Sequence, residues 1–208
     1  ELTEVGGATQ VGDGPGGFYS QEDYGRIVGY AAARHVMVVP EIDLPGHTNA
    51  ALSSRPALNC DGQATEPYRG MNVGFSSLCI GTPETDHFVD TVLTQLAELT
   101  PGPYLHIGGD EAQSTEPAEY RAFIERVDAK VRELGKTTMG WEDIAAADLD
   151  PSTVAQVWRD EHADRIAAQS LSIVASPAAH AYLDMKYDED MDIGLAWAGI
   201  IDTQRAYD

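Results

Sequence analysis

Apolar residues recur every three or four positions in several stretches of the chain, which is the spacing of one buried helix face. The first stretch begins with Ser20 and Asp23, a pair typical of a capping box. Ile27, Tyr30 and Ala31 then lie on one face of the expected helix. The second stretch follows a threonine and a proline, and proline is favoured at the first helical position. The periodicity predicts helices over residues 20–35, 83–99, 117–134 and 162–169.

Runs rich in β-branched and other apolar residues lie between these helices and predict strands. They are VMVVPEID, YLHIGG, KTTMGW, TVAQVW and LSIVAS, at residues 36–43, 104–109, 136–141, 153–158 and 171–176. Strands that alternate with helices long enough to cross over indicate a parallel sheet with helices packed outside it. We therefore expect about five strands in a single α/β domain that covers residues 1–208, since no linker divides the chain.

Most of the predicted strands end in acids or tryptophans, namely Glu41, Asp43, Asp110, Glu111, Trp141 and Trp158. In a (β/α)8 barrel the active site lies at the carboxyl ends of the strands, so this pattern favours a barrel with one shared pocket. A doubly wound sheet is the alternative, and it usually carries a glycine-rich phosphate loop after its first strand. The glycine-rich VGDGPGG of this chain follows no predicted strand and precedes no Walker lysine, so we interpret it as a plain loop.

Composition narrows the class of partner. The chain has 34 acids and 13 basic residues, a net charge of −21, and such a surface repels nucleic acid and anionic membranes. A small neutral substrate fits this charge better than a polyanion. There is no apolar run of about 18 residues, so we expect no membrane span. The first residues of the chain are typical of a loop and do not resemble a signal peptide.

The candidate chemistry is that of a carbohydrate site, because sugar C–H faces pack on aromatic rings while sugar hydroxyls need acceptors. The candidate residues are Asp110, Glu111 and Asp184, with Trp141, Trp158, Tyr182 and Trp197. Asp110 and Glu111 are adjacent, and adjacent side chains of a regular strand point to opposite faces. The two glycines before them let the backbone leave the ideal pleat, so that both carboxylates can reach one pocket. Neighbouring anions repel, and one of them can then keep its proton.

The two cysteines, Cys60 and Cys79, flank a loop-like segment. Their spacing leaves two interpretations open: two unrelated thiols, or a disulfide that fixes a long loop in an exported protein. The chain has no CxxC motif and no cluster of cysteine and histidine. The sequence therefore predicts no zinc site and no cofactor.

The residues HIGGDEA, at positions 106–112, resemble the His-x-Gly-Gly-Asp-Glu signature of the family 20 glycoside hydrolases, the β-N-acetylhexosaminidases. The run VVPEIDLPGHTNAAL resembles the strand-3 block of that family, and MGWED, QVW, YLDMKY and LAWAG resemble later blocks in the same order. The segment from LNCDG to GFSSLC resembles the secreted actinobacterial members. This likeness implies a (β/α)8 barrel, a disulfide between Cys60 and Cys79, and secretion.

The resemblance also implies retaining hydrolysis of terminal GlcNAc or GalNAc residues, in which the 2-acetamido oxygen of the substrate attacks C1. Glu111 would then be the general acid and afterwards the general base, and Asp110 would accept the acetamido N–H and stabilise the developing positive charge. The other implied roles are Tyr182 as a donor to the acetamido oxygen, Trp141 and Trp158 as walls, Asp184 as a partner of sugar hydroxyls, Trp197 as a pocket residue, and His47, with Asp43 nearby, as the support of Glu111. His106 is interpreted as structural. The expected partners are N-acetylhexosaminides and chito-oligosaccharides.

The arginine of the family's first strand, the acidic block of its second and the tryptophan and acid of its eighth have no counterpart here. We therefore expect about strands 3 to 7 of an incomplete barrel, and an isolated chain that is weakly active or inactive. Two other functions stay open. One is a metal-dependent hydrolase with ligands among His47, His106, Asp43, Asp110 and Glu111. The other is a non-catalytic protein that binds N-acetylhexosamine.

Overall fold

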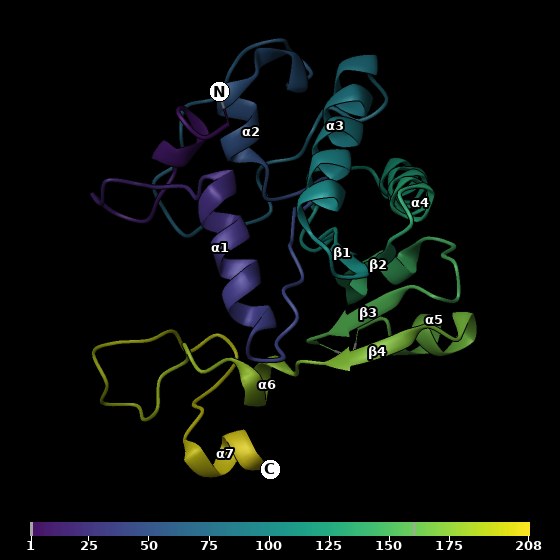
Figure 1. Ribbon diagram of the computed structural model, residues 1–208. Helices are drawn as coiled ribbons and strands as arrows, with labels where there is room; N and C mark the ends of the chain where they lie inside the picture. The colour runs from purple at the N-terminus through teal and green to yellow at the C-terminus, as the bar shows by residue number, and fades with distance from the viewer. Residues whose placement is uncertain (1, 160) are drawn as a thin grey trace.

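A single parallel sheet organises the computed structural model, which describes residues 2–159 and 161–208. Its strands are β1 (Tyr104–His106), β2 (Thr137–Trp141), β3 (Val154–Val157) and β4 (Ser172–Ala175). They lie side by side in chain order, and each neighbouring pair is parallel (Figure 1). All four were predicted from their apolar runs.

The helices are α1 (Gln21–Ala32), α2 (Asn49–Ser54), α3 (Pro83–Leu99), α4 (Pro117–Glu133), α5 (Ala163–Gln169), α6 (Ala178–Ala181) and α7 (Thr203–Tyr207). Short 3-10 turns are η1 (Gly6–Ala8), η2 (Pro56–Leu58) and η3 (Glu142–Ala146). The predicted starts of two helices are confirmed: Ser20 and Asp23 form a capping box at α1, and the Thr82 hydroxyl caps α3. Among the described residues, no helix combines the length and apolar character needed to cross a membrane.

The main core lies between the sheet and the helices on its outer side, where α3 and α4 run next to each other (Figure 1). β1 with the residue after it, and β3, contribute every second residue to it: Leu105, Ile107, Ala155 and Val157. The helices contribute apolar residues three or four apart, including Val89, Leu93, Ile124, Val127 and Val131. This layer holds the carboxyl ends of β1, β2 and β3 in fixed positions.

The predicted strand over residues 36–43 is wrong. This segment is extended and forms only an isolated parallel bridge, from Glu41 to His106. Its hydrogen bonds to β1 run from the Ile42 and Leu44 N–H groups to the carbonyls of His106 and Ile107, at 3.0 and 2.9 Å. Pro40 has no N–H to offer to a ladder, and the start of the segment is exposed rather than buried. The sheet therefore has four strands in the part of the chain that the structure describes, not about five.

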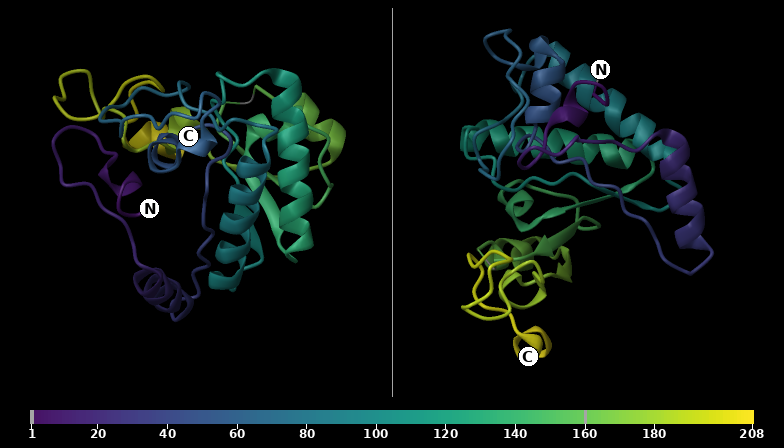
Figure 2. Two further views of the ribbon diagram at one scale, coloured as in Figure 1. Left: turned by 90° about the horizontal axis from the view of Figure 1, so that it is seen from above. Right: turned by 90° about the vertical axis from the view of Figure 1, so that its left-hand side faces the viewer.

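The apolar face predicted for α1 is present but uncovered. No residue of α1 is buried, and both Ile27 and Tyr30 are exposed. The helix stands apart from the pair formed by α3 and α4 (Figure 2). A hydrogen bond of 2.8 Å between the hydroxyls of Tyr24 and Thr100 connects it to the end of α3. At the other edge of the sheet, all residues of β4 are exposed.

Candidate active site

The backbone turns sharply after β1, and this turn brings the two adjacent acids together. Gly108 and Gly109 have φ angles of 66° and 99°, a left-handed region that favours glycine. A side chain at Gly108 would overlap Asp43, and one at Gly109 would overlap Ile144. Glu111 is also left-handed, with φ 49°. The expected departure from the strand pleat is therefore confirmed.

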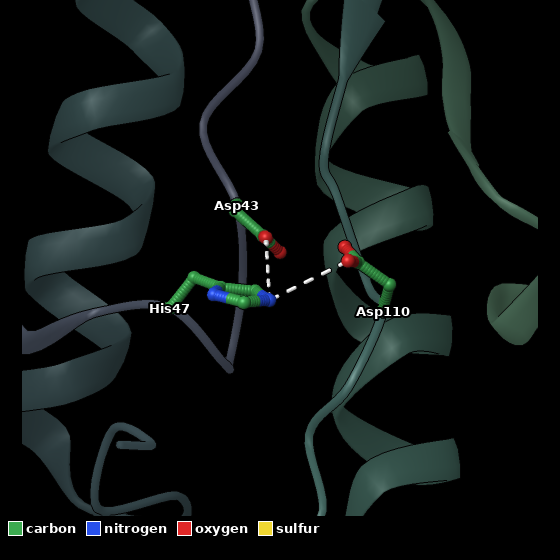
Figure 3. Close-up of side chains that lie close together, drawn as sticks. All are labelled: Asp43, His47 and Asp110. Carbon is green, nitrogen blue, oxygen red and sulfur yellow. Dashed lines mark ion pairs between the residues drawn. The ribbon is translucent and has the colours of Figure 1, made fainter. Parts of the chain in front are cut away.

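His47 lies close to the carboxylates of the site, and Figure 3 shows it next to Asp43 and Asp110. It sits just before α2, on a backbone with φ 53°. Its Nε2 atom is 3.4 Å from Asp110 Oδ2 and 3.3 Å from Glu111 Oε2. The same nitrogen is 3.9 Å from Asp43 Oδ2. One imidazole thus contacts the two acids of the signature and approaches a third carboxyl from the segment before it.

Burial and neighbouring charges shift the pKa values of Asp43, His47 and Asp110. Burial raises the pKa of Asp43 to about 8, and the negative charge of Asp110 adds to that shift. A hydrogen bond to Asp110 raises the pKa of His47 to about 9, against the effect of burial. Burial also opposes the charge of Asp110, but hydrogen bonds from His47 and Asp43 keep its pKa below the usual value. At neutral pH Asp43 is therefore protonated, His47 is a cation and Asp110 is an anion.

Four aromatic side chains form one wall beside the carboxylates. The ring of Trp158 packs against Trp141 at 6.1 Å, Tyr182 at 6.1 Å and Trp197 at 5.8 Å between ring centroids. Tyr182 and Trp197 also contact each other, at 5.5 Å. Burial raises the pKa of Tyr182 to about 12, so its phenol keeps its proton at physiological pH. The wall offers apolar ring faces and one hydroxyl donor.

A pocket of about 740 Å³ lies between this wall and the carboxylates. Its lining residues are His47, Met71, Asn72, Val73, Asp110, Glu111, Trp141, Trp158, Arg159, Tyr182, Leu195 and Trp197. Residues 71–73 belong to the loop between Cys60 and Cys79, which are joined by a disulfide with a Cα–Cα distance of 4.9 Å. The bonded interpretation of the two cysteines is therefore the one that the structure adopts, and the bond closes a loop at the pocket rim.

The loop after β3, which carries Trp158, is held by a buried carboxylate that the sequence analysis did not single out. Glu142 is 0% exposed and lies in η3, directly after β2. Its oxygens accept the backbone N–H groups of Trp158, Arg159 and Glu161 at 3.2, 3.3 and 3.0 Å. The Arg159 guanidinium in turn lies 3.9 Å from the centre of the Trp158 ring. Glu142 follows the end of β2, and Arg159 follows the end of β3. This position after a strand is the signal that could have identified them.

Comparison with known proteins decides the family. The profile described as "Glycosyl hydrolase family 20, catalytic domain" matches residues 1–121 and 114–208, which together cover the chain. The chain belongs to glycosyl hydrolase family 20. The resemblance noted for HIGGDEA and its accompanying blocks is therefore confirmed.

Relatives in family 20 show how much of the fold is present. A beta-N-acetylhexosaminidase of Cellulomonas fimi is 44% identical, over 100% of this chain and 42% of that protein. The solved GH20 enzyme of Streptomyces coelicolor A3(2) has a TM-score of 0.96 and 50% identity, over 100% of this chain and 44% of its own. A mutant Streptomyces plicatus beta-hexosaminidase in complex with product (GlcNAc) has a TM-score of 0.95 and 50% identity, over 100% of this chain and 43% of its own. The chain spans less than half the length of these relatives, and its fold is part of a (β/α)8 barrel, as expected.

Within this family 20 fold, most of the candidate residues meet at one pocket, and two do not line it. Asp184 is exposed and absent from the lining, and its backbone carbonyl accepts the Leu195 N–H at 3.1 Å. Asp43 lies behind the lining, next to His47 and Asp110. Asp184 therefore stays a sequence-based prediction as a sugar contact.

Among the described residues, one group has donor atoms close enough for a metal ion: Asp43, His47 and Asp110, within 4.8 Å of one another. This group is the centre of the site itself. A metal would have to displace the protons that Asp43 and His47 hold at neutral pH. Protons on Asp43 and His47 therefore compete with any metal at this group.

Proposed function

We propose that this chain supplies the catalytic carboxylates of a β-N-acetylhexosaminidase that releases terminal non-reducing GlcNAc or GalNAc residues. The observation that carries the proposal is the meeting of Asp110 and Glu111 at His47, beside a pocket walled by aromatic rings. The names of the family relatives and the GlcNAc complex of the Streptomyces plicatus enzyme support this class of substrate.

The nucleophile in this proposal is the 2-acetamido oxygen of the substrate, which closes onto C1 as the glycosidic bond breaks. Asp110 suits the acetamido N–H, because its side chain lines the pocket next to the aromatic wall. Its lowered pKa keeps it anionic, as stabilisation of a positive ring requires. The protonated hydroxyl of Tyr182 donates to the acetamido oxygen and orients it.

Glu111 is the proposed acid and base. It gives a proton to the glycosidic oxygen while the bond from C1 to that oxygen breaks. Water then attacks C1 of the cyclic intermediate and loses a proton to Glu111, which regenerates the acetamido group and the acid. His47, 3.3 Å from Glu111 Oε2, holds the carboxyl in place.

We further propose that the protein acts outside the cell on chito-oligosaccharides, without metal or cofactor. The disulfide at the pocket rim and the net charge of −21 support an extracellular setting. The isolated chain of 208 residues is expected to be weakly active or inactive, because α1 and β4 leave apolar side chains uncovered.

The test compares this chain with a version extended to the length of its relatives. The extended enzyme should hydrolyse p-nitrophenyl N-acetyl-β-D-glucosaminide and chitobiose, resist a chelator, and be inhibited by N-acetylglucosamine-thiazoline. Glu111→Gln should lower kcat about 10²- to 10⁴-fold on chitobiose and less on the p-nitrophenyl substrate, whose leaving group needs less protonation. Glu98→Gln, an exposed change on α3, is the matched control and should leave kcat unchanged.

Each alternative has its own outcome. Binding of the sugar without turnover would indicate a non-catalytic protein that kept its pocket. Loss of activity with the chelator would support the metal-dependent hydrolase. Turnover by the short chain at the rate of the extended enzyme would overturn the expectation for the isolated chain.

A further inference from the structure

Glu41 makes a contact at the pocket that its position in the sequence does not suggest. Its Oε1 atom accepts the indole N–H of Trp141 at 2.9 Å, across 100 residues of sequence. The same oxygen lies 3.4 Å from His106 Nδ1. The His106 ring meets the Trp141 ring edge-on, with centroids 5.4 Å apart. Trp141 is thus held through its polar edge and through one side of its ring.

Glu41 acts from outside the pocket. It does not line the pocket, whereas Trp141 does. Partial burial works against the charge of Glu41, yet hydrogen bonds from His106 and Trp141 hold its pKa below the usual value. The acceptor is therefore an anion at neutral pH, and a hydrogen bond to an anion is stronger than one between neutral groups.

His106 connects this contact to the turn that carries the two acids. Its Nδ1 atom lies 3.4 Å from the Glu41 carboxylate and 3.1 Å from the backbone nitrogen of Gly108, and it donates to the carboxylate when it carries the ring proton. His106 is 5% exposed, so its ring has little freedom to move. Glu41, His106 and Trp141 therefore form a continuous set of contacts from the extended segment before α2 to the end of β2.

We propose that Glu41 is a positioning residue that fixes the indole plane of Trp141 and thereby sets how tightly the pocket holds the 2-acetamido group. The second half of this statement rests on the proposed function. The first half concerns only the side chain of Trp141. Without Glu41, no polar contact would fix the direction of the indole N–H. The rings of His106 and Trp158 touch Trp141 but form no hydrogen bond with its indole nitrogen.

A double-mutant cycle in the extended enzyme tests the proposal, with N-acetylglucosamine-thiazoline as the probe. Glu41→Ala should weaken thiazoline binding about 10- to 100-fold, the usual effect of losing a hydrogen bond to a charged group. Glu41→Gln, which keeps an acceptor oxygen, should recover part of that loss. In a Trp141→Phe background an aromatic ring is kept but the indole N–H is gone. Glu41→Ala should therefore cause little further loss of thiazoline affinity. Glu98→Ala is the matched control and should not change binding.

An indole signal separates this proposal from the proposed function. In protein labelled with ¹⁵N-tryptophan, the Trp141 indole resonance, assigned by its loss in Trp141→Phe, should move upfield in Glu41→Ala without any ligand. Additive losses of affinity in the cycle, or an indole resonance that does not move, would overturn the positioning role. If the wild-type enzyme binds no thiazoline, the proposed function fails, and the indole resonance still decides the role of Glu41.

Discussion

The floor of the pocket, which carries Asp110 and Glu111, and the aromatic wall are built in different ways. The floor lies at the ends of β1 and β2, above a core in which Ile124 and Val127 are 0% exposed. Much of the wall comes from residues 182–197, an irregular segment in which Leu183 and Ile193 are 75% and 79% exposed. The acids are therefore positioned by a buried sheet, whereas Tyr182 and Trp197 depend on contacts with each other and with Trp158.

The backbone hydrogen bonds show the same difference. The floor strands pair continuously with their neighbours. The wall segment has an isolated bridge between Met185 and Leu195, with the Lys186 N–H donating to the Leu195 carbonyl at 2.6 Å. A segment with few ladder contacts opens at a lower free energy than a core strand. The comparison implies that this part of the wall adapts while the carboxylates stay fixed.

The largest expected difference concerns stability. Ile124→Ala removes a fully buried side chain from α4 and should lower the free energy of unfolding by about 2–5 kcal/mol. Leu183→Ala, in the wall segment, should change it by less than about 0.5 kcal/mol. Urea unfolding of both variants checks this. Similar losses would show that the wall segment is packed as firmly as the floor.

The disulfide should have the next largest effect, because it closes the rim loop, whose residues 71–73 line the pocket. Its cysteines are 19 residues apart, and a loop of this size corresponds to about 3 kcal/mol. Replacing both Cys60 and Cys79 by serine should lower the urea midpoint accordingly. Reductant added to the wild type should reproduce the loss and leave the double variant unchanged. A double variant as stable as the wild type would contradict this role.

Trp197→Ala removes one ring from the wall and should cost affinity rather than stability. Its side chain is 55% exposed, so its removal uncovers little of the core. We expect thiazoline binding to weaken about tenfold, with an unfolding midpoint close to that of the wild type. Tyr207→Ala, an exposed change on α7, is the control for binding. An unchanged affinity would remove Trp197 from the functional wall.

A change of pH should act on the floor and not on the wall. Asp43, with a pKa of about 8, is neutral below that pH and becomes a second anion beside Asp110 above it. We therefore expect kcat/KM to fall as the pH rises through about 8. Asp43→Asn keeps a neutral side chain at every pH, so the fall through about 8 should be absent in this variant. The measurement is a pH profile of both enzymes, and coincident alkaline limbs would exclude Asp43 as the titrating group.

The sequence predicted the elements with strong local signals. Helices α3 and α4 have a cap or a proline at the start and apolar residues at regular spacing, and the structure confirms both. The meeting of Asp110 and Glu111 followed from their place after two glycines. The run at residues 36–43 misled, because its β-branched residues suggested burial, whereas Pro40 limits its pairing and its first residues are exposed.

Other features depend on contacts between distant residues and could not be predicted. Glu41 and Trp141 are separated by 100 residues, and no local pattern indicates their hydrogen bond. The proton of the carboxyl cluster was expected within the Asp110–Glu111 pair. Burial instead raises the pKa of Asp43 the most. Such a shift reflects desolvation in the folded state, which a sequence does not encode locally.

Glu142 has a consequence for protein engineering. Its carboxylate accepts the backbone N–H groups of Trp158, Arg159 and Glu161 in the described part of the loop after β3, so that loop takes its shape from a residue directly after β2. A library that varies only residues 158–162 samples sequences for a loop whose anchor is left unchanged. Transplanting the loop from a relative should succeed only when the start of η3 is exchanged with it. For redesign of sugar preference, these two segments are a single module.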